Sequence, residues 1–457
     1  MSQSADGMSR RRGARGRLVG LMGVIVTGAV VLAGCDQLLD VDLPGDLAAD
    51  ALAVPPNAEM LANSAQAQFE CFFANYAVAN ALWTDEAVTG SQRAGRQFWM
   101  TRGHPPIWGG RGTGPCESTS QGNAYTPMDN HYRSWANARD YSRFLEEWSD
   151  DEVVGNRIDL LARTRAYAAY SLMLFGESHC AGAVLEPNDP VSTPREVMAE
   201  AAEWWTRTFE AANQVGNQEI AQLALVGQAR VKLWQRDPAA AADIAEQVVP
   251  GFRYDATYEE HPERENHVAT EMGRDAHVSV FPELTGIPQE VDGVPDPRMA
   301  LVDRGRTGVD GRTPIWASVK ALSRSDPIRM ASWEEAQLIV AEGRLGPEAV
   351  AIINTLRDQH GLPAYVPADV SDDEEILDQV LEERRRELFL EGHRINDLLR
   401  HFDRPSIRNA WPEGQTHDGD PIHERYCLWF LEEEVNANPN VSSADIPDSM
   451  HPDVMRR

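Results

Sequence analysis

The chain has 457 residues, with 42 basic and 71 acidic side chains and a formal net charge of −29 at pH 7. A charge of this sign and size argues against nucleic acid or an anionic membrane surface as a partner, because both would be repelled. The length would accommodate two or three ordinary domains.

The N-terminus predicts a lipoprotein signal peptide over residues 1–34. Five arginines precede an apolar run over residues 18–31, which is closed by the lipobox sequence "LAGC" ending at Cys35. The run is too short and too rich in glycine to span a bilayer. We therefore expect cleavage before Cys35, lipidation of its thiol with further acylation of the new amine, and a lipidated tether over residues 35–56. The alternative is an ordinary signal peptide with a chance cysteine. Loss of the leader would take the net charge from −29 to −33, because the leader carries five arginines and Asp6.

Helical patterns recur from Asn57 onward, and none of the long segments shows the alternation of a strand. Polar capping residues, prolines at first helical positions and a closing glycine mark where these helices begin and end. The marks are Thr193-Pro194, Asp237-Pro238, Ser332 with Glu335, Gly346-Pro347 and, as a stop, Gly361. The pattern predicts antiparallel helix pairs.

One predicted pair has the small residues of a tetratricopeptide hairpin. In "LALVGQARVKLWQRDPAAAADIAEQVVP", Leu225 stands at the packing position, while Gly227 and Ala239 stand where neighbouring helices approach closely. The period is irregular along the chain. We therefore predict an all-α fold of tetratricopeptide-like helix pairs, forming one domain over residues 57–457.

Two long insertions interrupt the helices, at about residues 84–129 and 252–313. The first is rich in glycine, proline, arginine and aromatic residues, so no helix is expected in it. The second carries five prolines, which also interrupt helices. Loops of this length in a compact protein are functional or disordered. The aromatic residues of the first insertion argue against disorder.

Four cysteines follow Cys35 in the sequence, namely Cys71, Cys116, Cys180 and Cys427. An even number in an exported chain permits two disulfides with three possible connectivities. We expect at least one disulfide, with Cys71–Cys116 preferred because it would tie the first insertion to the helix before it. The alternative is four buried thiols. The spacings do not match a zinc knuckle, so neither a metal site nor a cofactor is expected.

The stretch "ELFLEGHRINDLLRH", residues 387–401, is predicted to form a single helix. Its two histidines, His393 and His401, lie eight residues or about 12 Å apart along a helix axis, too far to share one metal ion. Opposite charges three residues apart predict two ion pairs, Glu391–Arg394 and Asp397–Arg400. An apolar stripe with a spacing of four or seven residues runs along this segment and the residues before it, over Leu377, Leu381, Leu388, Ile395 and Leu399. These features favour a helix that holds the fold over an active site.

The same stretch carries a family resemblance. "EERRRELFLEGHRINDLLR" resembles the signature helix near the C-terminus of the SusD/RagB family, nutrient-binding lipoproteins of the bacterial outer membrane. "DPRMALVDRG", "DPIRMASWEEAQLIVAEGRL", "EEEVNANPN" and "CDQLLDVDLPGD" resemble other segments of that family. One departure is Ile395-Asn396, where the family often has an aromatic pair. The residues in register with the signature are Glu383, Arg384, Arg385, Glu387, Leu388, Glu391, Gly392, Arg394, Asp397 and Leu398.

The resemblance implies a function without catalysis. It implies a lipid-anchored protein of the outer membrane, facing the cell exterior, that captures a nutrient and delivers it to a SusC-like TonB-dependent transporter. An oligosaccharide is the first choice of ligand and a peptide the alternative. In the family the signature helix marks the fold, so its residues are not carried over as ligand contacts.

The sequence itself offers candidates for ligand recognition in the insertions. A flat aromatic face stacks on the C–H face of a pyranose, while arginine or asparagine at the edge binds its hydroxyls. The candidates are Trp83, Trp99, Trp108, Tyr125 and Trp316, with Arg96, Arg102 and Asn123 as polar partners. The alternative for each is an aromatic side chain that packs beneath its loop.

A lipid-anchored glycan hydrolase is the competing hypothesis from another class. Asp85 and Glu86 lie beside the same aromatic residues, and two carboxylates are sufficient for glycoside hydrolysis. Adjacent residues rarely face one another across a cleft, so the binding protein is favoured.

Overall fold

The computed structural model describes residues 52–92, 94–103, 127–261, 264–428, 435–436, 438–445 and 451–454. Contacts within the chain divide it into two units, Met1–Leu52 and Ala53–Arg457, and the second unit holds nearly all of the described residues. Cys35 and the predicted leader lie outside them. Among the helices of the described part, none is long and apolar enough to cross a membrane.

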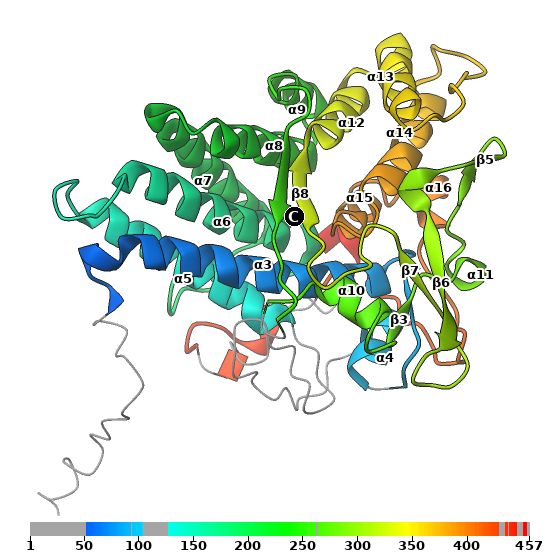
Figure 1. Cartoon of the computed structure of the whole chain (residues 1–457), viewed down its shortest axis with the longest axis horizontal. Helices are drawn as coiled ribbons and strands as arrows, with labels where there is room; N and C mark the ends of the chain where they lie inside the picture. The colour runs from blue at the N-terminus through cyan, green and yellow to red at the C-terminus, as the bar shows by residue number, and fades with distance from the viewer. Residues whose placement is uncertain are drawn as a thin grey trace, which may run out of the picture. The chain divides into compact units, whose positions relative to one another are not determined.

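Antiparallel helix pairs form the larger part of the second unit, as predicted. The long helices pack in succession, with contacts α3–α5, α5–α6, α6–α7, α7–α8, α8–α9 and α9–α12 (Figure 1). α12 also contacts both α13 and α14. The helices are α3 (Ala58–Trp83), α5 (Pro127–Glu147), α6 (Arg157–Ser178), α7 (Pro194–Val215), α8 (Gln218–Trp234), α9 (Pro238–Ala245), α12 (Trp333–Arg344), α13 (Gly346–Gln359) and α14 (Asp373–Glu387).

The predicted start and stop signals act where the sequence places them. Thr193 and Glu196 form a reciprocal capping box at the start of α7, and Asp237 caps α9 by accepting a hydrogen bond from a backbone N–H three residues on. Ser332 caps α12 in the same way. Gly361, with a φ of +66°, follows the end of α13. Local side-chain chemistry therefore fixes these helix ends.

The predicted tetratricopeptide-like contact is half right. A Cβ at Gly227 would lie 2.2 Å from Cε2 of Trp205, so glycine allows α7 and α8 to approach closely. Ala239, however, is exposed. The small residue that faces a neighbour on α9 is Ala242, whose Cβ would lie 2.8 Å from a Cβ at Gly343 of α12. The helix begins at Pro238, so its buried face falls three residues later than the sequence motif suggested.

The expectation that the first insertion holds no helix is wrong. α4 (Ala94–Thr101) forms within it and packs on α3. Its segment "AGRQFWMT" contains no proline, and Phe98, Trp99 and Met100 are buried. The hydrophobic contact with α3 therefore outweighs the low helix propensity of the neighbouring glycines and prolines.

Within the described residues, four antiparallel two-stranded sheets, absent from the sequence prediction, hold the insertions together, with pairs β1–β3, β2–β8, β4–β5 and β6–β7. Most strands have two to five residues, too few for an alternating pattern to stand out. The elements are β1 (Val88–Thr89), β2 (Arg253–Ala256), α10 (His267–Met272), β3 (Val278–Ser279), α11 (Pro282–Thr285), β4 (Glu290–Val291), β5 (Val294–Pro295), η2 (Pro297–Met299), β6 (Leu301–Thr307), β7 (Pro314–Ser318) and β8 (Ile328–Ser332).

A disulfide joins Cys180, just after α6, to Cys427 near the C-terminus. This confirms the prediction of at least one disulfide and identifies one pair that the spacing could not choose. Cys71 is also disulfide-bonded. Its predicted partner, Cys116, lies outside the described residues, so that pairing stays a prediction.

Candidate functional site

The segment predicted as one helix is broken by a turn at residues 388–393. α14 ends at Glu387, and α15 (Arg394–Arg400) begins after the six residues that form the turn. Leu390 and Gly392 both have positive φ values, +61° and +79°, which a continuous helix does not allow. A Cβ at Gly392 would lie 3.2 Å from the ring of Tyr76, so the turn also lies close against α3.

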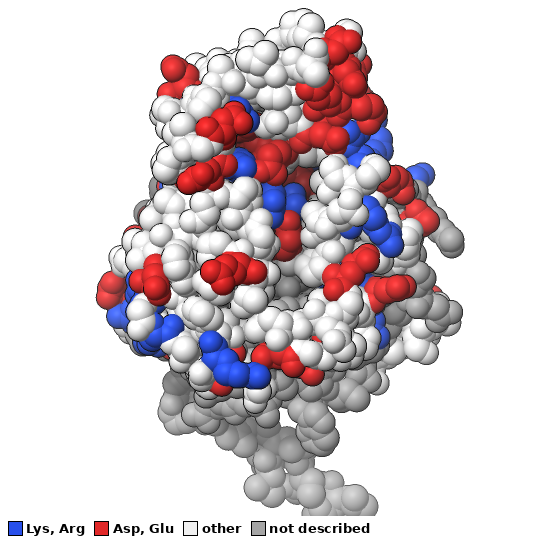
Figure 2. Space-filling model, turned by 90° about the vertical axis from the view of Figure 1, so that its right-hand side faces the viewer, with Lys and Arg blue, Asp and Glu red and all other residues white. Residues whose placement is uncertain are grey.

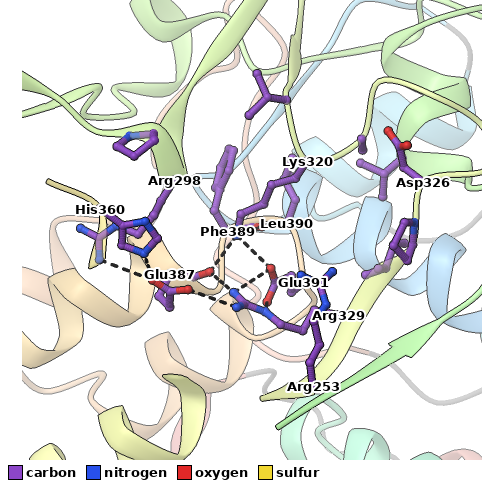
Figure 3. Close-up of a pocket in the computed structure, with 16 residues that line it drawn as sticks. Arg253, Arg298, Lys320, Asp326, Arg329, His360, Glu387, Phe389, Leu390 and Glu391 are labelled. Atoms are coloured by element: carbon purple, nitrogen blue, oxygen red, sulfur yellow. Dashed lines mark hydrogen bonds and ion pairs between the residues drawn. The ribbon is translucent and has the colours of Figure 1, made fainter. Parts of the chain in front are cut away.

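This turn borders a cavity of about 420 Å³, here called the central cavity (Figure 3). Its walls come from β2, α10, η2, the segment after β7, β8, the residue after α13 and the 388–393 turn. Segments from both the second insertion and the helical core therefore meet at one site. The lining residues include Arg253, Val268, Pro297, Arg298, Val319, Lys320, Asp326, Pro327, Arg329, His360, Glu387, Phe389 and Glu391.

Ion pairs fix the charged wall of the central cavity. Arg329 binds Glu391 through Nε at 2.9 Å and Glu387 through Nη1 at 3.1 Å. Lys320 Nζ lies 2.8 Å from Glu391 Oε1 and also donates to the carbonyl of Glu387 at 2.7 Å. In Figure 3 these side chains converge on the two glutamates. Both glutamates are therefore neutralised and held in place by bases from the segment after β7 and from β8.

The pKa values of this wall follow from burial and from these contacts. Burial opposes ionisation of Glu387, but the hydrogen bond from His360 and the charge of Arg329 outweigh it and hold the pKa of that carboxyl below its usual range. Burial also lowers the pKa of Lys320, with the charge of Glu391 acting in the opposite direction. The wall thus presents a carboxylate and its bases as ordered hydrogen-bonding groups.

The mouth of the central cavity has side chains that remain accessible to solvent. The Arg253 side chain is 52% exposed and that of His360 is 26% exposed. A smaller cavity of about 270 Å³ shares Arg253, Arg329, His360 and Glu387 with the first. The two cavities therefore adjoin and share polar side chains.

The signature residues predicted to hold the fold make buried ion pairs beside this site. Arg384 pairs with Asp397 at 2.9 Å, and Arg394 with Asp85 at 2.7 Å. The predicted pair Asp397–Arg400 is present, at 2.8 Å. The predicted pair Glu391–Arg394 is wrong, because the 388–393 turn separates the two residues and Glu391 binds Lys320 and Arg329 instead.

Four of the sequence candidates are structural in this fold. Trp83 and Trp99 have no exposed surface, and their rings meet edge to face at 5.7 Å. The predicted stacking of a sugar on either indole is therefore wrong for this structure. Arg96 binds the buried Glu271, and the buried Arg102 donates to the carbonyl oxygens of Arg425 and Pro412. Their charges stabilise the insertion from within.

Trp316 is the one aromatic candidate in the described residues that keeps some exposure. It lies half-buried on β7, with its ring centroid 5.9 Å from that of Phe281 at a tilt of 39°. Trp108, Tyr125 and Asn123 lie outside the described residues and stay predictions.

The carboxylates of the hydrolase hypothesis are occupied by structural contacts. Arg394 and Arg385 both bind Asp85, the latter at 3.0 Å. Glu86 accepts a hydrogen bond from the backbone N–H of Leu390 at 3.1 Å. Burial raises the pKa of Glu86 to about 7, because this single hydrogen bond only partly stabilises the charged form. Glu86 thus ties the 388–393 turn to the segment after α3, and Asp85 ties the helices on either side of the turn to the same segment.

Sequence reasoning missed the residues of the central cavity. Arg329 and Phe389 lie in segments quoted for the family resemblance, and Lys320 lies between two such segments. Nothing local distinguishes these residues from surface or core residues. Gly392 was the available signal, because glycine after a helical run commonly marks a stop. Interpreted as such a stop, Gly392 would have placed a turn inside the predicted helix.

Comparison with known proteins identifies relatives of this fold. The model of the SusD family matches residues 335–438, which include most of α12, α13 to α15 and the 388–393 turn. A SusD superfamily protein of Parabacteroides distasonis superposes with a TM-score of 0.62 at 13% identity, covering 87% of this chain and 99% of that one. A SusD-like carbohydrate-binding protein of Bacteroides vulgatus gives 0.58 at 15% identity, covering 86% and 98%.

A third solved structure was determined with a bound glycan. Surface glycan-binding protein A of Bacteroides thetaiotaomicron, in complex with laminarihexaose, superposes with a TM-score of 0.59 at 14% identity, covering 84% of this chain and 98% of that one. The comparison with curated proteins found no match.

Proposed function

We propose that the chain is a member of the SusD family and a nonenzymatic surface lipoprotein that captures an oligosaccharide. The match of the SusD family model to residues 335–438 and the similarity of the fold to SusD-like structures support this proposal. In this proposal, Cys35 carries the lipid anchor in the outer membrane, the protein faces the cell exterior, and a TonB-dependent transporter receives the ligand. The observation that carries the proposal is the SusD-like fold, which a SusD-like carbohydrate-binding protein shares over 86% of this chain and a glycan-binding protein solved with laminarihexaose shares over 84%.

The central cavity is the proposed glycan site. Its volume of about 420 Å³ lies in the usual range for small-molecule pockets. Pro297, Val319 and Pro327 offer apolar surface for the C–H faces of a sugar, while Arg253 and His360 stand at the mouth as donors for its hydroxyls. On the face shown in Figure 2, acidic and basic side chains are interleaved around a hollow, a surface suited to a neutral ligand with many hydroxyl groups.

Fewer of the aromatic ligand contacts predicted from the sequence remain, because Trp83 and Trp99 are buried. Trp316, with Phe281 beside it, remains a candidate on the second insertion. Trp108, Tyr125 and Asn123 remain candidates on the first. They would extend the binding surface beyond the central cavity, in keeping with a ligand of several sugar units.

A binding assay with matched variants tests the proposed site. We expect the purified protein to bind at least one member of an oligosaccharide panel by calorimetry. The double variant Arg253→Ala/His360→Ala should weaken this binding at least tenfold, or about 1.4 kcal/mol. Arg344→Ala, which removes an arginine paired with Asp243 and Glu246 on the surface, should bind normally.

Three outcomes would contradict the proposal at different points. Normal binding by the double variant would place the site elsewhere. Binding of peptides and of no glycan would establish the alternative ligand class. New reducing ends after incubation with polysaccharide would show a hydrolase.

The anchor and the partner need separate tests. Cys35→Ala should leave the precursor uncut and abolish incorporation of radiolabelled palmitate, and equal labelling of the variant would refute lipidation at Cys35. Protease shaving of intact cells tests the outward placement. Copurification with an outer-membrane transporter from solubilised membranes tests the delivery role.

A further inference from the structure

A group of polar side chains lies where two inserted segments meet, away from the central cavity. The turn between β6 and β7, residues 308–313, supplies Asp310 and Thr313, and the segment 416–420 supplies His417 and Asp418. Thr313 Oγ1 donates to Asp310 Oδ2 at 2.5 Å and lies 3.0 Å from His417 Nε2. We call these four residues the turn cluster.

Asp310 is fixed by its own turn. Its Oδ1 accepts hydrogen bonds from the backbone N–H groups of Arg312 at 2.9 Å and Thr313 at 3.0 Å. The turn is itself tied to the first insertion, because the N–H of Asp310 donates to the carbonyl of Gly90 at 3.0 Å. The carboxylate of Asp310 is thus held in one orientation before any ligand binds.

The carboxylate of Asp418 gives an independent indication that the turn cluster binds a ligand. Its side chain is 7% exposed, and its Oδ2 is buried without a hydrogen-bond partner. This oxygen lies 3.7 Å from His417 Nε2, beyond hydrogen-bond distance. A buried carboxylate oxygen without a partner is costly, and such atoms in native proteins are commonly explained by water or an ion.

The spacing of the donor atoms suits a metal ion. One ligand atom each from Asp310, His417 and Asp418 lie within 4.8 Å of one another. Tetrahedral bonds of about 2.1 Å separate ligand atoms by roughly 3.4 Å, close to the 3.7 Å between His417 Nε2 and Asp418 Oδ2. One imidazole with two carboxylates is a donor set for a first-row divalent ion, whereas calcium prefers oxygen alone.

We propose that Asp310, His417 and Asp418 bind a divalent first-row transition metal ion, with Zn²⁺ as the probe. The ion joins the β6–β7 turn to the segment 416–420. That segment continues to His423, whose N–H donates to the carbonyl of Thr101 at the end of α4 at 2.8 Å. Metal binding therefore braces both insertions against each other, a role that is independent of the proposed glycan binding and of the cysteines.

One cation competes with the metal. Arg312 Nη2 lies 2.6 Å from Asp418 Oδ1, and its side chain is 60% exposed. Because most of the Arg312 side chain is exposed, it can turn into solvent when a metal binds. Removal of this charge by Arg312→Ala should therefore tighten Zn²⁺ binding severalfold.

A second acidic group in the described residues serves as the matched control. Glu271, Asp275 and His277 also place ligand atoms within 4.8 Å. There, however, Arg96 binds Glu271 and Arg274 binds Asp275 at 2.8 Å, so arginine neutralises both carboxylates. In the proposed site, Arg312 pairs with one of the two carboxylates, that of Asp418. Asp275→Asn should leave Zn²⁺ binding unchanged.

The test is calorimetry with ZnCl₂ on the tag-free full chain carrying Cys35→Ser, which removes a competing thiol. We expect one Zn²⁺ per chain with a Kd in the micromolar range or below, and at least tenfold weaker binding for His417→Ala and for Asp418→Asn. Thermal melting without metal shows whether each variant folds, and added Zn²⁺ should raise the Tm of the parent but not of these variants.

Several results would overturn the proposal. They are no Zn²⁺ binding by the parent protein, retention of tight binding by His417→Ala, or a loss caused equally by Asp275→Asn. Binding of Ca²⁺ in preference to Zn²⁺ would refute the assignment to a transition metal. A variant that fails to fold is replaced by His417→Gln, which keeps the side-chain volume nearer to that of histidine.

Discussion

Replacement of Arg394 by alanine tests whether the signature segment holds the fold rather than the ligand. Arg394 binds Asp85 through two hydrogen bonds, from Nε at 2.7 Å and from Nη2 at 2.8 Å. The two side chains are only 4% and 9% exposed. Loss of one partner of a buried pair costs about 3–5 kcal/mol, because a charge is left without compensation.

The magnitude should lie at the lower end of this range. Arg385 remains 3.0 Å from Asp85 and continues to neutralise it, so we expect a loss of about 3 kcal/mol. A unit of roughly 400 residues has an unfolding entropy near 0.8 kcal/mol per kelvin, so this loss corresponds to a fall in Tm of about 4 °C.

Thermal melting followed by circular dichroism measures this effect, with Arg344→Ala as a surface control. The double variant Asp85→Ala/Arg394→Ala should recover part of the loss, because it removes the carboxylate left with a single partner. A normal Tm for Arg394→Ala would refute the structural role. Normal folding together with lost glycan affinity would place Arg394 in the binding site instead.

Three other predictions concern pH, the buried indoles and the disulfide. Burial raises the pKa of Glu86 to about 7, so between about pH 4.5 and 7 the folded protein retains a proton that the unfolded chain loses. The contribution of this proton to the stability of the folded state is full below about pH 4.5 and is lost as pH rises through about 7. Glu86→Gln should therefore gain in Tm relative to the parent between pH 5 and 8, and a constant difference would contradict the assignment. Trp99→Ala should cost about 3–5 kcal/mol of stability through the cavity left beside Trp83. Calorimetry should find the glycan affinity of the folded variant unchanged, and weaker binding would show that the indole of Trp99 belongs to the binding site. The variant Cys180→Ser/Cys427→Ser removes a disulfide between residues 247 positions apart. Its free energy of unfolding should fall by about 5 kcal/mol in the chain-entropy model. An equal Tm for variant and parent would argue against a stabilising role.

The helical frame could be predicted because its signals are local. Thr193, Asp237 and Ser332 cap helices by contacts within three residues of themselves, and Gly361 ends a helix through its own backbone conformation. Such signals need no knowledge of the partner surface. The short strands were missed because pairs such as β2 and β8 lie more than 70 positions apart and have four or five residues each.

The central cavity could not be predicted, because its wall is assembled from distant segments. Glu391 was expected to bind Arg394, three residues on. It binds Lys320 and Arg329 instead, 71 and 62 positions away in the sequence. The 388–393 turn decides this outcome, since it ends the helix on which the local pairing depended.

The tertiary structure also decided which aromatic side chains are available to a ligand. Composition marked Trp99 and Trp316 alike as aromatic residues within or beside an insertion. Packing of α4 on α3 buries the first completely, while β7 leaves the second half-buried on the β6–β7 hairpin. The sequence by itself determined the helix pairs and the family signature, since both depend on residues near one another in the chain. Exposure, cavity walls and cysteine pairing depend on contacts between segments far apart, and only the folded chain sets those contacts.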